Sequence, residues 1–203
     1  MPALEALLDR FAAAHTQPFG ISVDSVFSHG SWAQSLGGIS FPLLADFHPK
    51  GAVAESYGLY LADKGITDRA TVIIDAGGVV RHVSSVTPAG KRDIAELAAL
   101  CESIDAEHGG DLPAAAAAPG LGDGLTLYIK GSCGFSRQVL WARDNLHVAD
   151  ALPVRDVSAD AEALAALRAK AGSEQVPALD MGDRVMHESA DIIAYLVEHA
   201  APR

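Results

Sequence analysis

Residues 125–136 read Leu-Thr-Leu-Tyr-Ile-Lys-Gly-Ser-Cys-Gly-Phe-Ser, and this stretch decides the fold. The alternating apolar side chains of residues 125–130 predict a β-strand, and a helix is expected over residues 135–145. Cys133 therefore lies at a strand-to-helix junction, where a thiol is most easily converted to a thiolate. The stretch predicts the start of an α/β domain with a reactive sulfur at the junction.

The surroundings of Cys133 in the sequence predict a lowered thiol pKa. The oriented amides at a helix N-terminus act as a partial positive charge, and Lys130, three residues earlier, adds a full one. Ser136 occupies the position where a second cysteine would complete a redox pair. Any thiol chemistry here must therefore use Cys133 and a second thiol supplied from outside the chain.

Composition places the chain among ordinary globular proteins. It has 203 residues, of which 49% are apolar and 20% charged, which predicts one or two domains. No apolar run reaches the roughly 20 residues needed to cross a bilayer, and the first residues lack the pattern of a secretory leader. A cytoplasmic location without a membrane partner is therefore expected.

Charge and cysteine content exclude further classes of function. A net charge of −11 without any basic run argues against nucleic-acid binding through phosphate neutralisation. The two cysteines, 32 positions apart, are expected to be thiols rather than a disulfide. The eight histidines show no metal-ligand spacing, so no metal site is predicted.

The composition changes sharply over residues 108–122, where glycines and prolines surround a run of five alanines. This segment predicts a linker between a domain at residues 1–107 and another at residues 123–203. Beyond it the expected elements follow the order β-α-β-α-β-β-α, the order of a compact α/β domain. They are strands 125–130 and 154–157, helices 135–145, 161–170 and 191–199, and a hairpin around Gly182.

The first domain has weaker periodicity. The expected elements are a helix near residues 4–11, a strand at 19–24, helices at 31–36 and 49–57, and a hairpin of strands 71–75 and 79–83. Ser28 is predicted to cap the helix at 31–36. In a closing helix, Ile94, Leu97, Cys101 and Ile104 share one face, which gives Cys101 a structural role.

The second domain resembles a monothiol glutaredoxin. Residues 133–139 (Cys-Gly-Phe-Ser-Arg-Gln-Val) resemble the active-site segment of that family, and Val176-Pro177 resembles the cis-proline loop that faces the cysteine in thioredoxin-fold proteins. Residues 188–196 resemble the segment that holds the γ-glutamyl end of glutathione in glutaredoxins and in the N-terminal domain of glutathione transferases. The resemblance implies a thioredoxin fold over residues 123–203.

The same resemblance implies glutathione as co-substrate. Glutathione has a carboxylate at each end, so cationic groups and helix N-termini suit it. A cis peptide bond before Pro177 would turn the backbone of Val176 outward to pair with glutathione as a strand would. The predicted catalytic residue is Cys133, and the predicted glutathione-binding residues are Lys130, Phe135, Val176, Pro177, Glu188 and Ser189.

Each of these residues also has a purely structural reading. Cys133 could be an inert buried thiol, and Pro177 an ordinary trans turn proline. Glu188 and Ser189 could have no role beyond capping a helix, and Phe135 could belong to the core.

Departures from the glutaredoxin pattern bear on iron–sulfur chemistry. The cluster-binding type usually has its lysine further upstream, a Trp-Pro segment, and a Gly-Gly pair before the last helix. Here Lys130 stands three residues before Cys133, and residues 186–189 (Met-His-Glu-Ser) replace the glycines. A bridging [2Fe–2S] cluster on two copies of Cys133 and two glutathiones therefore ranks behind glutathione as co-substrate.

The first domain resembles a peroxiredoxin of the AhpC/TSA type. Residues 19–25, 41–46 and 69–75 are similar to consecutive segments of that family across residues 3–105. Arg69 matches the arginine that polarises the peroxide, whereas the stretch with the peroxidatic cysteine has no counterpart. The expected domain is a truncated thioredoxin fold without the strand between strands 19–24 and 71–75. Either these two strands pair directly, or the start codon given is too late, or another chain supplies the strand.

Together the two halves resemble a peroxiredoxin–glutaredoxin fusion: an α/β protein with two thioredoxin-fold domains. The leading hypothesis is a glutathione-dependent thiol-disulfide oxidoreductase acting on glutathionylated or disulfide substrates, with homo-oligomerisation through the first domain. The alternatives are a thiol peroxidase whose catalytic N-terminal segment is missing, and a non-catalytic module that binds glutathione or an iron–sulfur cluster. A complete glutathione transferase is not expected, because no helical second domain follows.

Overall fold

The computed structural model of the protein describes residues 1–114 and 116–201. The chain forms two compact units. The first contains Met1–His29 and Phe41–Ala116, and the second contains Gly30–Ser40 and the chain from Ala117 onward.

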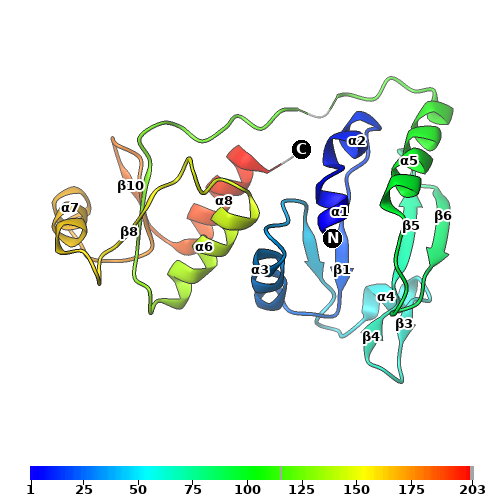
Figure 1. Ribbon diagram of the computed structural model, residues 1–203, viewed down its shortest axis with the longest axis horizontal. Helices are drawn as coiled ribbons and strands as arrows, with labels where there is room; N and C mark the ends of the chain where they lie inside the picture. Colours follow the sequence, from blue (N-terminus) through cyan, green and yellow to red (C-terminus); the bar gives the residue numbers. More distant parts are fainter. Residues whose placement is uncertain (115, 202–203) are drawn as a thin grey trace. The chain divides into compact units, whose positions relative to one another are not determined.

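The second unit contains a four-stranded sheet in the order β10-β9-β7-β8 (Figure 1). Strand β7 (Thr126–Ile129) lies in the middle, parallel to β8 (Val154–Asp156) and antiparallel to β9 (Ala178–Asp180). Strand β10 (Val185–Met186) pairs antiparallel with β9 around Gly182, whose φ is 86°. The order β-α-β-α-β-β-α predicted from the sequence is confirmed.

The two-residue period of β7 divides its side chains between two cores. Leu127 and Ile129 pack in the cluster that contains Val139 of helix α6 (Gly134–Asn145) and Ile192 of helix α8 (Ser189–Ala200). Tyr128 faces the opposite way, against Ala163 and Leu167 of helix α7 (Ala161–Ala171). Helices α6 and α8 thus cover one face of the sheet, and α7 covers the other.

The two ends of helix α7 are determined by residues that the sequence shows directly. The Asp160 carboxylate accepts hydrogen bonds from the amides of Glu162 (2.9 Å) and Ala163 (3.0 Å), an N-cap that satisfies two otherwise unpaired donors. Gly172 ends the helix with φ 65°, a left-handed conformation that glycine adopts without strain.

The first unit contains pairs of strands rather than one sheet. Strand β1 (Gly20–Ser22) is parallel to β2 (Leu43–Ala45), and β5 (Ala70–Ile74) is antiparallel to β6 (Val80–Ser85). A third pair is formed by β3 (Tyr60–Leu61) and β4 (Ile66–Thr67). The helices are α1 (Pro2–Glu5), α2 (Leu8–Ala13), α3 (Val26–Ser35), α4 (Ala52–Ser56) and α5 (Ile94–His108).

Helix α5 supplies the core of the first unit. Cys101 is 4% exposed and packs with Phe11, Ala14 and Ile73, as the helical period predicts. Burial, partly offset by a hydrogen bond with Thr16, raises the pKa of the Cys101 thiol. Cys101 is therefore a structural residue.

The structure excludes one of the three explanations for the gap beside β1. Within the described residues, β1 pairs only with β2, and β5 pairs only with β6. Direct pairing of the strands predicted at 19–24 and 71–75 is therefore wrong. Ile21 and Ile74 stay exposed beside these unpaired edges. The other two explanations remain predictions.

The predicted cap of the helix that follows β1 is also wrong. Helix α3 begins at Val26, so that Ser28 lies inside it rather than at its start. The Ser25 hydroxyl instead accepts the hydrogen bond from the amide of Ser28 at 3.2 Å. Two serines three residues apart both fit the capping pattern, and the sequence does not separate them.

The described residues of the predicted linker (108–114 and 116–122) contain no strand, and their only helical residue is His108, the last of α5. The described part of the chain also contains no helix with the length and apolarity that a membrane span needs.

Candidate functional site

Cys133 occupies the N-cap position of α6, with φ −88° and ψ 121°. Its amide donates to the carbonyl of Lys130 at 2.9 Å, and its carbonyl accepts from the amide of Arg137 at 3.1 Å. The chain thus turns from β7 directly into the first turn of α6. The thiol is partly exposed, and its Sγ donates to the carbonyl of Val176 at 3.8 Å. The reading of Cys133 as a fully buried thiol is therefore wrong.

The pKa of the Cys133 thiol lies below its ordinary value because four contributions outweigh burial. Burial alone would raise the pKa. Hydrogen bonds from the amide and hydroxyl of Ser136 and from the amide of Phe135, together with the charge of Lys130, lower it by stabilising the thiolate. The predicted effect of the helix amides and of Lys130 is confirmed.

Ser136 has a role that the sequence interpretation missed. It is 1% exposed, and its Oγ accepts from the amide of Lys130 at 3.3 Å. That bond leaves the hydroxyl hydrogen free to point at the thiolate. A buried serine in the first turn of a helix could have indicated this role, because a buried hydroxyl needs hydrogen-bond partners.

Replacing Ser136 by alanine is expected to raise the pKa of Cys133, because the thiolate loses one of its donors. Only the thiolate reacts with iodoacetamide, so the pH profile of alkylation should move to higher pH and the rate at neutral pH should fall. The measurement uses Cys101→Ser protein, in which Cys133 is the remaining thiol. Ser132→Ala, next to Cys133 but outside these hydrogen bonds, is the matched control. Identical profiles for Ser136→Ala and the control would contradict this role.

The loop before β9 faces Cys133. The Val176–Pro177 peptide bond is cis, so the reading of Pro177 as an ordinary trans proline is wrong. Pro177 is buried, whereas Val176 is partly exposed with its carbonyl toward the Cys133 thiol. This contact joins two segments that are 43 residues apart in the chain.

Gln175 connects this loop to the start of α8. Its Nε2 donates to Oε1 of Glu188 at 2.9 Å. Glu188 has φ 68° and precedes α8, and its side chain makes no capping hydrogen bond. Ser189 is the first residue of the helix, two residues earlier than the sequence predicts. The side chain of Glu188 therefore contacts the loop rather than capping the helix, and Gln175 is a neighbour of the candidate site that the sequence interpretation missed.

Two further predicted residues lie at the surface beside Cys133. Phe135 is 63% exposed, so its reading as a core residue is wrong. Lys130 is exposed at the end of β7. The structure thus brings Cys133, Lys130, Phe135, Val176, Pro177, Glu188 and Ser189 onto the β7–α6 turn, the loop before β9 and the start of α8.

Arg69 belongs to the other unit. It lies just before β5, where its Nη1 donates to the carbonyl of Gly90 at 3.3 Å. Arg92 is near it: burial and the charge of Arg69 lower the pKa of Arg92. The peroxiredoxin resemblance would require a reactive thiol near this arginine. Cys101 does not fill that role, because it is buried in the α5 core.

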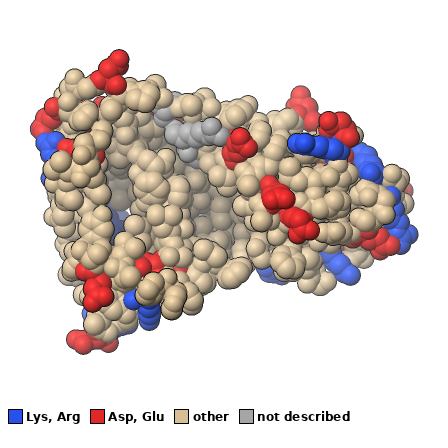
Figure 2. All heavy atoms as spheres, turned by 180° about the vertical axis from the view of Figure 1, so that it is seen from behind, with Lys and Arg blue, Asp and Glu red and all other residues tan. Residues whose placement is uncertain are grey.

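The described residues contain no group of three or more His, Cys, Asp or Glu side chains arranged to hold a metal ion. On the face shown in Figure 2, basic side chains are interspersed with acidic ones. That face of each unit therefore presents mixed charge rather than a broad basic surface.

Comparison with protein families finds a different match in each half of the chain. Residues 1–83 match the AhpC/TSA family, and residues 127–203 match the glutathione S-transferase N-terminal domain. The protein is thus an α/β protein with an N-terminal peroxiredoxin-like domain and a C-terminal thioredoxin-like domain.

Curated relatives match the first half. Alkyl hydroperoxide reductase E of Mycobacterium tuberculosis is 36% identical over 86 residues, which are 42% of this chain and 56% of that protein. A peroxiredoxin of Pyrococcus furiosus is 35% identical over 117 residues, covering 54% of this chain and 53% of the relative. The chain therefore spans about half the length of these relatives.

Among solved structures, Mycobacterium tuberculosis AhpC matches with 30% sequence identity and a TM-score of 0.46. The match covers 50% of this chain and 60% of that one.

Proposed function

We propose that the protein is a glutathione-dependent thiol-disulfide oxidoreductase of the monothiol glutaredoxin type, fused to a peroxiredoxin-like domain and serving redox homeostasis. The observation that carries the proposal is the Cys133 thiol, which has a lowered pKa at the N-terminus of α6 and faces the Val176–Pro177 loop. A thiolate that is stabilised yet accessible is the nucleophile that thiol-disulfide exchange needs.

In the proposed reaction the Cys133 thiolate attacks the glutathione sulfur of a glutathionylated protein. The new Cys133–glutathione disulfide forms as the old disulfide breaks, and the substrate leaves as a thiolate that takes a proton from water. A second glutathione thiolate then attacks the mixed disulfide, releasing glutathione disulfide and restoring the Cys133 thiolate. The net exchange consumes one reduced glutathione: its sulfur and the glutathione sulfur of the substrate end as one disulfide, and the protein sulfur of the substrate is reduced to a thiol. Ser136 has no sulfur, so the second step requires external glutathione.

The other residues of the site would bind and orient glutathione. The charge of Lys130 suits one glutathione carboxylate, and the amides at the start of α8 beside Ser189 suit the carboxylate of the γ-glutamyl end. The outward backbone of Val176 would pair with the cysteinyl backbone of glutathione. Phe135 offers an exposed apolar side chain next to the thiol. Glutathione is a co-substrate in this scheme, and the [2Fe–2S] cluster stays the secondary possibility.

The proposal is tested by following the release of glutathione from a glutathionylated peptide, with reduced glutathione as the electron donor. Catalysis should show saturation by both substrates and should require free glutathione, because no second cysteine can resolve the mixed disulfide. A peptide with an internal disulfide but no glutathione should react more slowly. Release no faster than the uncatalysed exchange would overturn the proposal.

A thiol peroxidase is the second candidate, supported by the similarity of residues 1–83 to the AhpC/TSA family. The thiol of this unit, Cys101, is buried and has a raised pKa, which opposes attack on a peroxide. Peroxide consumption by the 203-residue chain that survives Cys133→Ser would favour this candidate. A visible absorption band in anaerobically purified protein would instead favour the iron–sulfur-binding module.

A further inference from the structure

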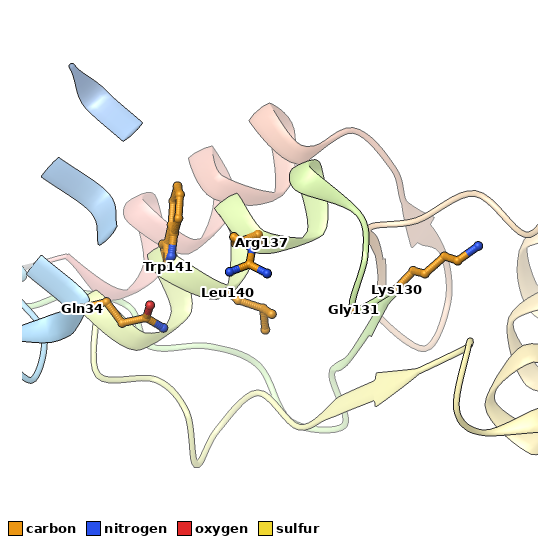
Figure 3. Close-up of a pocket in the computed structure, with 6 residues that line it drawn as sticks. All are labelled: Gln34, Lys130, Gly131, Arg137, Leu140 and Trp141. Carbon is orange, nitrogen blue, oxygen red and sulfur yellow. The ribbon is translucent and has the colours of Figure 1, made fainter. Parts of the chain in front are cut away.

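A cavity of ≈ 180 Å³ in the second unit adjoins the Cys133 segment (Figure 3). Its lining residues come from both sides of Cys133 in the chain, with one residue from the segment Gly30–Ser40. They are Gln34, Lys130, Gly131, Arg137, Leu140 and Trp141.

The cavity lies along the side of α6 that also carries Cys133. Arg137 and Trp141 stand four and eight positions after Cys133, so all three lie along one side of α6. Figure 3 shows Arg137, Leu140 and Trp141 projecting from the helix, while the amine of Lys130 extends away from them. The cavity therefore combines an aromatic ring, an aliphatic side chain and a guanidinium along the helix that begins at Cys133.

The positive charge at the cavity is not neutralised within the described part of the chain. In the second unit four cationic side chains form ion pairs with carboxylates: Arg143, Arg155, Arg168 and Lys170. Lys130, Arg137 and Arg184 have no carboxylate partner among the described residues, and the first two line the cavity. Unpaired cations of this unit are thus concentrated beside Cys133.

Two carboxylates that contact lining residues of the cavity are already engaged. Oδ2 of Asp156 accepts from the amide of Gly131 at 3.1 Å. Asp144 accepts from Gln34 at 2.5 Å and from Arg143 at 3.0 Å. Neither hydrogen-bonds to Arg137, so the guanidinium can form a charge-assisted pair with a carboxylate from outside.

We propose that this cavity binds an acidic peptide segment of the protein substrate whose disulfide Cys133 attacks. The carboxylate pairs with Arg137, and the apolar part of the segment packs on Trp141 and Leu140. The identification of the ligand as a substrate rests on the proposed function, whereas the binding itself does not. Of the predicted glutathione residues, Lys130 also lines this cavity, whereas Val176, Glu188 and Ser189 do not, so the two surfaces adjoin at Lys130 and the peptide surface continues along α6 to Arg137 and Trp141.

The test uses Trp141 as the reporter. The full chain with Trp32→Phe and Cys133→Ser keeps Trp141 as its one tryptophan and lacks the proposed nucleophile. The probe is a capped hexapeptide with three glutamates around an S-methylcysteine, and its comparison has glutamines in place of the glutamates. At low salt the acidic peptide should change the fluorescence with an about tenfold lower Kd than the neutral one, and salt should weaken this preference.

Adding Arg137→Gln should remove most of the preference for the acidic peptide, whereas Arg184→Gln, the matched control, should leave it unchanged. Calorimetric titration repeats the measurement without relying on the tryptophan. Equal Kd values for the two peptides, or a preference that survives Arg137→Gln, would overturn the proposal. So would S-methylglutathione binding that depends on Arg137, since the cavity would then belong to the glutathione site. These binding results do not depend on the deglutathionylation assay, so the two proposals fail separately.

Discussion

Replacing Cys133 by serine is expected to lower the rate of glutathione release from a glutathionylated peptide at least about a hundredfold. Serine keeps the size and polarity of the side chain but cannot form the thiolate that attacks a disulfide. The remaining cysteine cannot replace it, because Cys101 is 4% exposed and burial raises its pKa. The measurement is the steady-state rate at saturating glutathione.

Cys101→Ala is the control for this loss. Because Cys101 lies in the core of the first unit, its removal should leave the exchange rate near that of the wild type, with some loss of stability in that unit. Cys133→Ser should unfold like the wild type, because Cys133 is partly exposed. Retained activity in Cys133→Ser, or activity lost only in Cys101→Ala, would refute the assignment of the nucleophile.

Replacing Leu127 by alanine is expected to lower the free energy of unfolding of the second unit by about 2–5 kcal/mol. Leu127 is 0% exposed in the middle strand β7, where it packs in the cluster formed with α6 and α8. Truncation removes buried apolar surface and leaves a cavity between layers that cannot fully close. Urea unfolding of Trp32→Phe protein, followed by Trp141 fluorescence, reports on this unit.

The matched control is Val197→Ala in α8, whose side chain is 47% exposed. Its effect should stay within about 0.5 kcal/mol, because little packing is lost at such a position. A loss below about 1 kcal/mol for Leu127→Ala would contradict the layered core described above.

Much of the second unit could be predicted because its signals are local. The alternation of side chains around Leu127 and Tyr128 predicts the strand. Asp160 marks the start of α7 through its side-chain cap, and Gly172 marks its end through a left-handed backbone conformation. The predicted start of α8 misses Ser189 because the preceding Glu188, with φ 68°, is held by Gln175 instead of acting as an ordinary cap. Gln175 and Glu188 are 13 residues apart in the chain, and a contact over that separation produces no periodic pattern in the sequence.

The first unit was harder to predict for a different reason. Its hairpin β5–β6 follows from a local alternation with a turn at residues 76–78, which the sequence shows directly. Backbone hydrogen bonds between distant segments decide whether β1 pairs with β5. The side-chain pattern of either strand does not indicate which strand lies beside it. Ile21 and Ile74 are exposed in the structure, on strands that have no second partner among the described residues.

The sequence by itself determined that there are two domains, though not that Gly30–Ser40 groups with the second unit. It also determined the β-α-β-α-β-β-α order and the position of Cys133 between β7 and α6 with Lys130 close by. These follow from periodicity, turn residues and helix ends, which act over a few residues. Only the tertiary structure decided that the Cys133 thiol faces the carbonyl of Val176 and that Gln175 holds Glu188. It also decided that unpaired Arg137 lines a cavity with Trp141. Such contacts arise when packing of the sheet and helices brings distant segments together, so no local pattern specifies them.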